Sequence, residues 1–191
     1  LYGNRELIKY DGKYWMFYHA YPGVGYEVGA AANGLAWTTD EELLEWHCEE
    51  SPVFEKGAPG QWDGGGLYST WIVPNNGRFM LYYNGKEATT GSWHEQVGVA
   101  FSDSLHDWKR YENNPVLKVT PNHWDSVFSC GQHVLFDSRK KRWVMFYCGF
   151  DAKHAQDGVA VSDDMINWEK CPEPIIPNGK PGDLDSIHAH K

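Results

Sequence analysis

Short runs of apolar and aromatic residues alternate along this chain with Gly, Asn, Asp and Pro, and no segment sustains the period of a helix. The clearest run occurs three times, at residues 14–18, 79–83 and 143–147. Its central residues Met16, Leu81 and Met145 lie 65 and 64 residues apart. Runs of this length bounded by turn formers are typical of β-strands and hairpins. The pattern therefore predicts an all-β protein built from a repeated unit.

Further signals recur in the same order within each unit. A second apolar run begins at a glycine, a tryptophan follows it, a Pro-Val or Pro-Ile pair comes next, and a Trp-Asp or Leu-Asp pair opens the following unit. The glycines are Gly34, Gly98 and Gly158, and the tryptophans are Trp46, Trp108 and Trp168. About four strands in about 60 residues fit a β-propeller blade, with the aromatic residues filling the space between blades.

We predict one propeller domain over residues 1–191, with blades at about 1–61, 62–123 and 124–183 and a fourth blade that begins at residue 184. Each blade should hold four antiparallel strands, with the three aromatic runs in equivalent buried positions. Because propellers close with roughly four to eight blades, the ring needs blades outside this segment or association with another chain. The uncovered strand edges predict an oligomeric or poorly soluble protein when the segment is expressed alone.

Composition narrows the class of partner. Apolar residues make up 41% of the chain and aromatic residues 15%, which is enough for a sizeable core. The ten tryptophans favour stacking on sugar rings, although the repeated core accounts for most of them. The net charge of −9 argues against nucleic acid and anionic membranes, which attract basic proteins. No run of apolar residues in the sequence is long enough to cross a bilayer.

The four cysteines show neither a CxxC pair nor zinc-site spacing, so free thiols are predicted. Cys148 falls where the other blades have His19 and Asn84, and a buried thiol would fit there. We predict no cofactor and no metal ligand, with a structural metal ion in the channel left open. Localisation stays unknown, with a periplasmic or secreted location slightly favoured.

The strings at 13–18, at 97–103 with Trp108, and at 157–164 with Trp168 resemble the blades of five-bladed propeller glycosidases, which include glycoside hydrolase families 43, 32 and 130. The resemblance covers the whole chain and implies a five-bladed ring with the active site at one end of its channel. It implies a glycosidase that uses paired carboxylates, one protonated and one ionised. The family's Asp-Pro signature is missing, so its base cannot be assigned to a position here. A non-catalytic glycan- or protein-binding propeller and a glycoside phosphorylase remain as alternatives.

Catalytic carboxylates would come from the inner strands, which we place at 4–9, 66–73, 129–136 and from 186 onward. Glu6 lies within the first of these, and the repeated aspartates precede the other three. The catalytic candidates are therefore Glu6, Asp63, Asp125 and Asp185. Each has a structural alternative, Glu6 as a salt-bridge partner and the aspartates as acceptors of backbone N–H groups in the turn into the strand.

The substrate-binding candidates are polar and aromatic residues of the same strands. His188 and His190 are two residues apart and so share a face in a strand. His133 is placed at the equivalent position of the preceding blade, so that Glu6 and the three imidazoles should share one cavity. The candidates are Arg5, Trp71, His133, His188 and His190. Glu27 and Glu95 open later strands, and we assign both to solvated surface.

Overall fold

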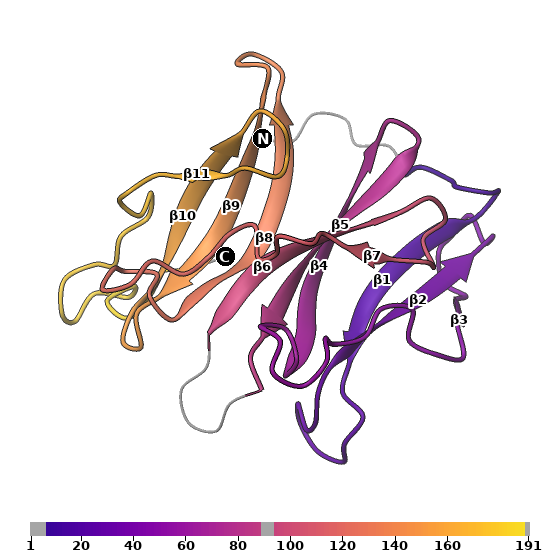
Figure 1. Cartoon of the computed structure of the whole chain (residues 1–191), viewed down its shortest axis with the longest axis horizontal. Coiled ribbons are helices and arrows are strands. Elements are labelled where there is room, and N and C mark those ends of the chain that lie inside the picture. Colours follow the sequence, from indigo (N-terminus) through magenta and orange to yellow (C-terminus); the bar gives the residue numbers. More distant parts are fainter. Residues whose placement is uncertain (1–6, 89–93, 190–191) are drawn as a thin grey trace.

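The computed structural model describes residues 7–88 and 94–189, and this part of the chain contains twelve strands and no helix. Three groups of strands stand side by side in the order of the sequence (Figure 1). None of the described residues forms a helix that could span a membrane. The prediction of an all-β fold is confirmed, and each group has the strand order of a propeller blade.

The strands of each group follow one another along the chain. The first group comprises β1 (Tyr14–Ala20), β2 (Ala32–Thr38) and β3 (His47–Cys48). The second comprises β4 (Gly66–Asn75), β5 (Arg78–Lys86), β6 (Glu95–Ser102) and β7 (Lys109–Arg110). The third comprises β8 (Phe128–Asp137), β9 (Arg142–Phe150), β10 (Ala155–Ser162) and β11 (Glu169–Lys170), and β12 (His188–Ala189) follows it.

Neighbouring strands within each group pair antiparallel. The first group forms a sheet of its own, whereas parallel bridges join the second group to the third and the third to β12. Glu95 at the start of β6 bridges to Phe128 at the start of β8, and Ala155 in β10 pairs in the same way with His188 in β12. β12 therefore begins the next blade. The strand groups fall inside the predicted blade ranges, whereas the exact boundaries stay a prediction. Residues 4–6 of the inner strand predicted at 4–9 lie outside the described residues, and residues 7–9 form no strand, so the prediction is wrong for that half.

The residues that recur are those that pack the blades. Trp62 stacks on Tyr83 with the ring centroids 5.7 Å apart, and Trp124 stacks on Tyr147 at 5.6 Å. Both tyrosines are fully buried. A Cβ atom on Gly98 would lie 2.6 Å from the Tyr83 ring and 2.7 Å from the Trp62 ring. Tryptophan, tyrosine and glycine therefore recur together, because the two rings pack against a strand position that has no room for a side chain.

The second set of recurring tryptophans belongs to turns. The indole N–H of Trp46 donates to the carbonyl of Leu43 at 2.8 Å, and Trp108 donates to Leu105 at the same distance. In the first of these turns the Asp40 carboxylate accepts backbone N–H groups of the residues that follow it. These contacts are local, so the turns recur as units within each blade.

One expectation about burial is wrong. Leu81 and Met145 are fully buried, but the equivalent Met16 is 46% exposed. Leu81 packs in a core with Phe17 of the first group, and Met145 packs in a core with residues of the second group. This face of each blade therefore packs against the preceding blade, and no described strand group precedes β1.

Candidate active site

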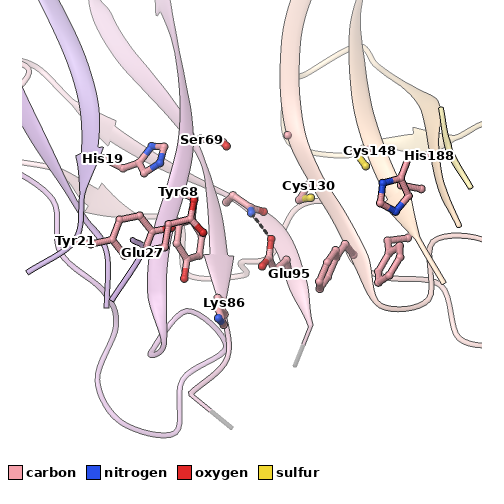
Figure 2. Close-up of a pocket in the computed structure, with 15 residues that line it drawn as sticks. His19, Tyr21, Glu27, Tyr68, Ser69, Lys86, Glu95, Cys130, Cys148 and His188 are labelled. Carbon is pink, nitrogen blue, oxygen red and sulfur yellow. Dashed lines mark hydrogen bonds between the residues drawn. The ribbon is translucent and has the colours of Figure 1, made fainter. Parts of the chain in front are cut away.

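A pocket of about 530 Å³ lies where the starts of the inner strands meet the ends of their neighbours (Figure 2). Residues of all three strand groups and of β12 contribute to its wall. The first group provides His19, Tyr21 and Glu27, and the second provides Tyr68, Ser69, Asn84, Lys86 and Glu95. The third provides Phe128, Cys130, Gly131, Cys148, Phe150 and Ala155, and β12 provides His188.

The wall of this pocket is the part of the blade in which the repeat breaks down. His19, Asn84 and Cys148 each follow the tyrosine that pairs with the repeated glycine, so they occupy one structural position. The position is an imidazole in one blade, an amide in the next and a thiol in the third. Packing alone would keep one residue type there, as it does for the adjacent tyrosine. The differences therefore indicate that these side chains serve the pocket.

Glu95 is the carboxylate most firmly held in the wall. Asn84 Nδ2 donates to Glu95 Oε2 at 2.9 Å (Figure 2), and Asn84 itself is only 3% exposed. The third blade has Ala155 at the position of Glu95, since both residues pair with the last strand position of their neighbours, Lys86 and Phe150. A carboxylate that one blade carries and the next lacks is not required by the fold.

Glu27 supplies a second carboxylate from the connection between β1 and β2. It lies beside Tyr21 and Tyr68, whose ring centroids are 5.8 Å apart (Figure 2). Burial raises the pKa of Tyr68 far above its usual value, and negative charge at Tyr21, Glu95 and Glu27 raises that pKa further. The Tyr68 hydroxyl therefore stays neutral and can donate a hydrogen bond to a bound ligand.

The pocket thus combines two carboxylates with an ammonium group, two imidazoles and several aromatic rings. His19 forms edge contacts with both tyrosines, at 6.0 Å to Tyr21 and 6.1 Å to Tyr68. Polar groups interleaved with aromatic faces suit a small polyhydroxylated ligand. Within residues 7–88 and 94–189, no group of three or more His, Cys, Asp or Glu side chains could hold a metal ion. The structural metal ion in the channel therefore stays a prediction.

Asp63 and Asp125 do not line this pocket. Each is 1% exposed and is paired with a cation from the outermost strand of its own blade. Arg110 Nε donates to Asp63 Oδ2 at 2.8 Å, and Lys170 Nζ donates to Asp125 Oδ2 at 2.5 Å. A buried tyrosine also donates to each aspartate: the Tyr83 hydroxyl donates to Asp63, and the Tyr147 hydroxyl donates to Asp125. This arrangement favours the structural alternative for both residues.

Asp185 is the third copy of the same turn. Its backbone carbonyl accepts from Asn178 Nδ2 at 3.0 Å and from the Gly179 N–H at 3.3 Å, as the Asp63 carbonyl accepts from the N–H of Gly57 at 3.2 Å. Asp185 is half-buried and does not line the pocket. Three other predicted residues lie outside the described part of the chain, namely Arg5, Glu6 and His190. Their roles stay predictions.

His133 and Trp71 lie together away from the pocket. Their rings are 4.6 Å apart, and Trp71 Nε1 donates to the carbonyl of Val134 at 2.9 Å. His188 lines the pocket but His133 does not, so the expectation that they share one cavity is wrong. His188 lies three residues after its repeated aspartate and His133 lies eight after, so His133 is farther along the inner strand.

Residues 4–184 match the N-terminal domain of glycosyl hydrolases family 32. The chain belongs to this family. It is 25% identical over 182 residues to the Arabidopsis thaliana protein named beta-fructofuranosidase, insoluble isoenzyme CWINV2, a match that covers 91% of this chain and 29% of the relative. A second insoluble isoenzyme from the same organism, CWINV1, is 27% identical over 193 residues, with 90% and 29% covered. The chain thus spans less than a third of the length of these curated relatives.

Solved structures agree with the family. A protein whose structure is described as a glycoside hydrolase is 27% identical and has a TM-score of 0.83, covering 99% of this chain and 57% of its own length. The Bombyx mori GH32 beta-fructofuranosidase BmSUC1 has a TM-score of 0.66 at 23% identity, covering 85% of this chain and 32% of its own length, and it supports the fold alone. The predicted resemblance to propeller glycosidases is confirmed.

Sequence reasoning missed the two carboxylates of the pocket, since it assigned Glu27 and Glu95 to solvated surface. One signal could have found Glu95, because aligning the repeats by their glycines sets it opposite Ala31 and Ala155. Glu27 carries no such signal, because it lies in a connection that differs in length from those of the other blades.

Proposed function

We propose that this chain is part of a glycoside hydrolase and that the pocket binds the sugar whose glycosidic bond is cleaved. The observation that supports the proposal most directly is the position of Glu95, an acidic residue held by the buried Asn84 in a wall where the equivalent residue of the next blade is Ala155. Family membership adds the reaction class, since glycoside hydrolysis needs two carboxyl groups beside the scissile bond.

The two carboxyl groups would take different roles. An ionised carboxylate only accepts hydrogen bonds, and Glu95 already accepts one from Asn84 Nδ2. We assign Glu95, which this hydrogen bond holds in place, to the role of the carboxylate that activates water or attacks the sugar carbon. Glu27 lies beside the Tyr68 ring and would be the acid that protonates the leaving oxygen (Figure 2). Glu6 stays the alternative partner, as predicted from the sequence.

The substrate proposed here is a carbohydrate with a furanoside linkage, because the curated relatives are named beta-fructofuranosidases. Tyr21 and Tyr68 offer ring faces against which a sugar can pack, and Lys86 and His19 offer donors for hydroxyl groups. The periplasmic or secreted location and the need for further blades or a partner chain to close the ring also stay proposals.

The test compares the Glu95→Gln and Glu27→Gln variants of the full-length protein with the parent on sucrose and on a panel of aryl furanosides. Loss of a positioned acid or base should lower kcat by about 10²–10⁴-fold. Glu112→Gln is the matched control, because Glu112 is exposed and does not line the pocket. All variants should melt within a few degrees of the parent.

Two outcomes would contradict the proposal. Full turnover by Glu95→Gln would remove Glu95 from the reaction. A parent protein that binds these glycans but hydrolyses none of them would favour the non-catalytic binding propeller instead.

A further inference from the structure

Two cysteines face each other in the wall of the pocket. Cys130 of β8 and Cys148 of β9 are direct partners in the antiparallel register, and both line the cavity. Figure 2 shows both sulfur atoms on the wall formed by the third blade. No disulfide joins them in this structure.

The backbone places these thiols at a spacing that a disulfide can bridge. Directly opposed residues in an antiparallel pair have Cα atoms about 4.5 or about 5.5 Å apart. Both spacings fall within the range of about 4.4–6.8 Å found for disulfides. The register shifts immediately after Cys130, where Gly131 has a φ of 63°. A Cβ atom on Gly131 would be 3.8 Å from the Cβ atom of Cys148, so β9 lies close to the irregular segment.

The fold does not require thiols at this pair of positions. In the second blade the same register pair is Tyr68 and Asn84, followed by an equivalent irregularity in the strand. The blade therefore accepts a phenol and an amide where the third blade has two thiols. Because neither position constrains the packing to cysteine, the joint presence of two cysteines at one pair in the pocket wall points to chemistry between them.

We propose that Cys130 and Cys148 form a dithiol that closes reversibly to a disulfide in the wall of the pocket, with a low-molecular-weight disulfide such as oxidised glutathione as the oxidant. The thiolate of one cysteine attacks a sulfur of the oxidant, and one glutathione thiolate leaves. The second cysteine thiolate then attacks the protein sulfur of the mixed disulfide and releases the other glutathione thiolate. The two protons of the cysteine thiols finish on the two glutathione molecules, and two electrons move from protein to oxidant.

The thiol chemistry is independent of the activity, whereas any consequence for sugar binding rests on the proposed function. Closing the bond would remove two S–H groups from the wall and tie β8 to β9 beside Gly131. If the pocket binds sugar, the oxidised protein should bind it with a different affinity from the reduced protein.

The experiment equilibrates the full-length native protein with mixtures of reduced and oxidised glutathione, followed by alkylation, proteolysis without reduction, and mass spectrometry. The expected product is a peptide pair linked through Cys130 and Cys148, which reduction separates. The Cys130→Ser and Cys148→Ser variants should instead carry one glutathione on the remaining pocket thiol. Cys48→Ser is the matched control and should form the link like the parent.

The proposal is overturned if both pocket cysteines are recovered alkylated at every glutathione ratio, or if they carry only separate glutathione adducts. It is also overturned if either cysteine links to Cys48 or Cys171 instead. Sugar hydrolysis is measured on the same samples. Formation of the link without any change in hydrolysis supports the dithiol and counts against this pocket as the sugar site, so the two proposals can fail separately.

Discussion

Replacing Asp125 by asparagine separates the structural from the catalytic interpretation of the repeated aspartates. The substitution keeps the shape of the side chain but removes its charge from a site that is 1% exposed. Its partner Lys170 has only 19% of its side chain exposed, and burial lowers the pKa of Lys170 against the opposing effect of Asp125. The variant therefore leaves a largely buried ammonium group without its counter-ion.

The size of the effect follows from the surroundings of Lys170. Breaking one side of a buried ion pair costs about 3–5 kcal/mol. Lys170 would still donate to the carbonyl of Lys118 and to Thr120 Oγ1 at 3.3 Å and Ser129 Oγ at 2.9 Å. Because these acceptors remain, we expect the free energy of unfolding to fall by about 3 kcal/mol, the lower end of that range.

Two matched variants calibrate this number. Asp63→Asn should cost less, between about 1 and 3 kcal/mol, because its partner Arg110 is 31% exposed and retains more solvent. Adding Lys170→Met to Asp125→Asn should recover part of the lost stability, since it removes the uncompensated charge.

Urea unfolding of the full-length protein measures the effect as a shift in midpoint at an unchanged slope. Turnover is measured below the transition, where both variants are folded. The structural interpretation predicts a large loss of stability and retained turnover per folded molecule. A variant that unfolds within about 0.5 kcal/mol of the parent but loses turnover would refute it and return Asp125 to the catalytic candidates.

Two other predictions concern pH and packing. Burial alone would raise the pKa of Asp164, but N–H donors of the following turn outweigh it and lower that pKa to about 2. The resulting stability is present above about pH 3.8 and is lost as the pH falls through about 2. Asp164→Ala should therefore be less stable than the parent at pH 7, and in thermal melts the difference should shrink as the pH falls from about 3.8 to about 2. Gly98→Ala should destabilise by at least about 1–3 kcal/mol in urea, because the new methyl group meets the rings of Tyr83 and Trp62. Gly60→Ala, with nothing within 4 Å but a φ of 87°, should show the cost of backbone strain alone.

The blade could be predicted from the sequence because its packing is made by residues that recur. Trp62 and Tyr83 stack over a bare strand position, and Asp63 accepts from the same tyrosine. Each blade needs the same contacts, so the same residue types return after about 62–64 residues, as Trp124, Asp125 and Tyr147 do. The repeat therefore predicted which runs form strands and how these strands group into blades.

The candidate site could be predicted only in part. His188 was identified because it lies in a predicted inner strand and shares a face with His190, and it does line the pocket. His133 was placed wrongly because the two histidines were aligned with each other and not with the repeated aspartates. Counting from Asp125 and Asp185 sets His188 opposite Phe128, which also lines the pocket.

What only the tertiary structure decided is which unrepeated residues meet. The pocket lies at the ends of strands from neighbouring blades, so its wall joins side chains far apart in the chain, such as Glu27 and Glu95. The period of the sequence pattern indicates on which face of a strand a residue lies, because successive side chains along a strand point to opposite faces. It does not report the distance between strand ends, which depends on how each blade stacks on the next. The sequence by itself therefore determined the blade and its packing residues, and the stacking of the blades determined the site.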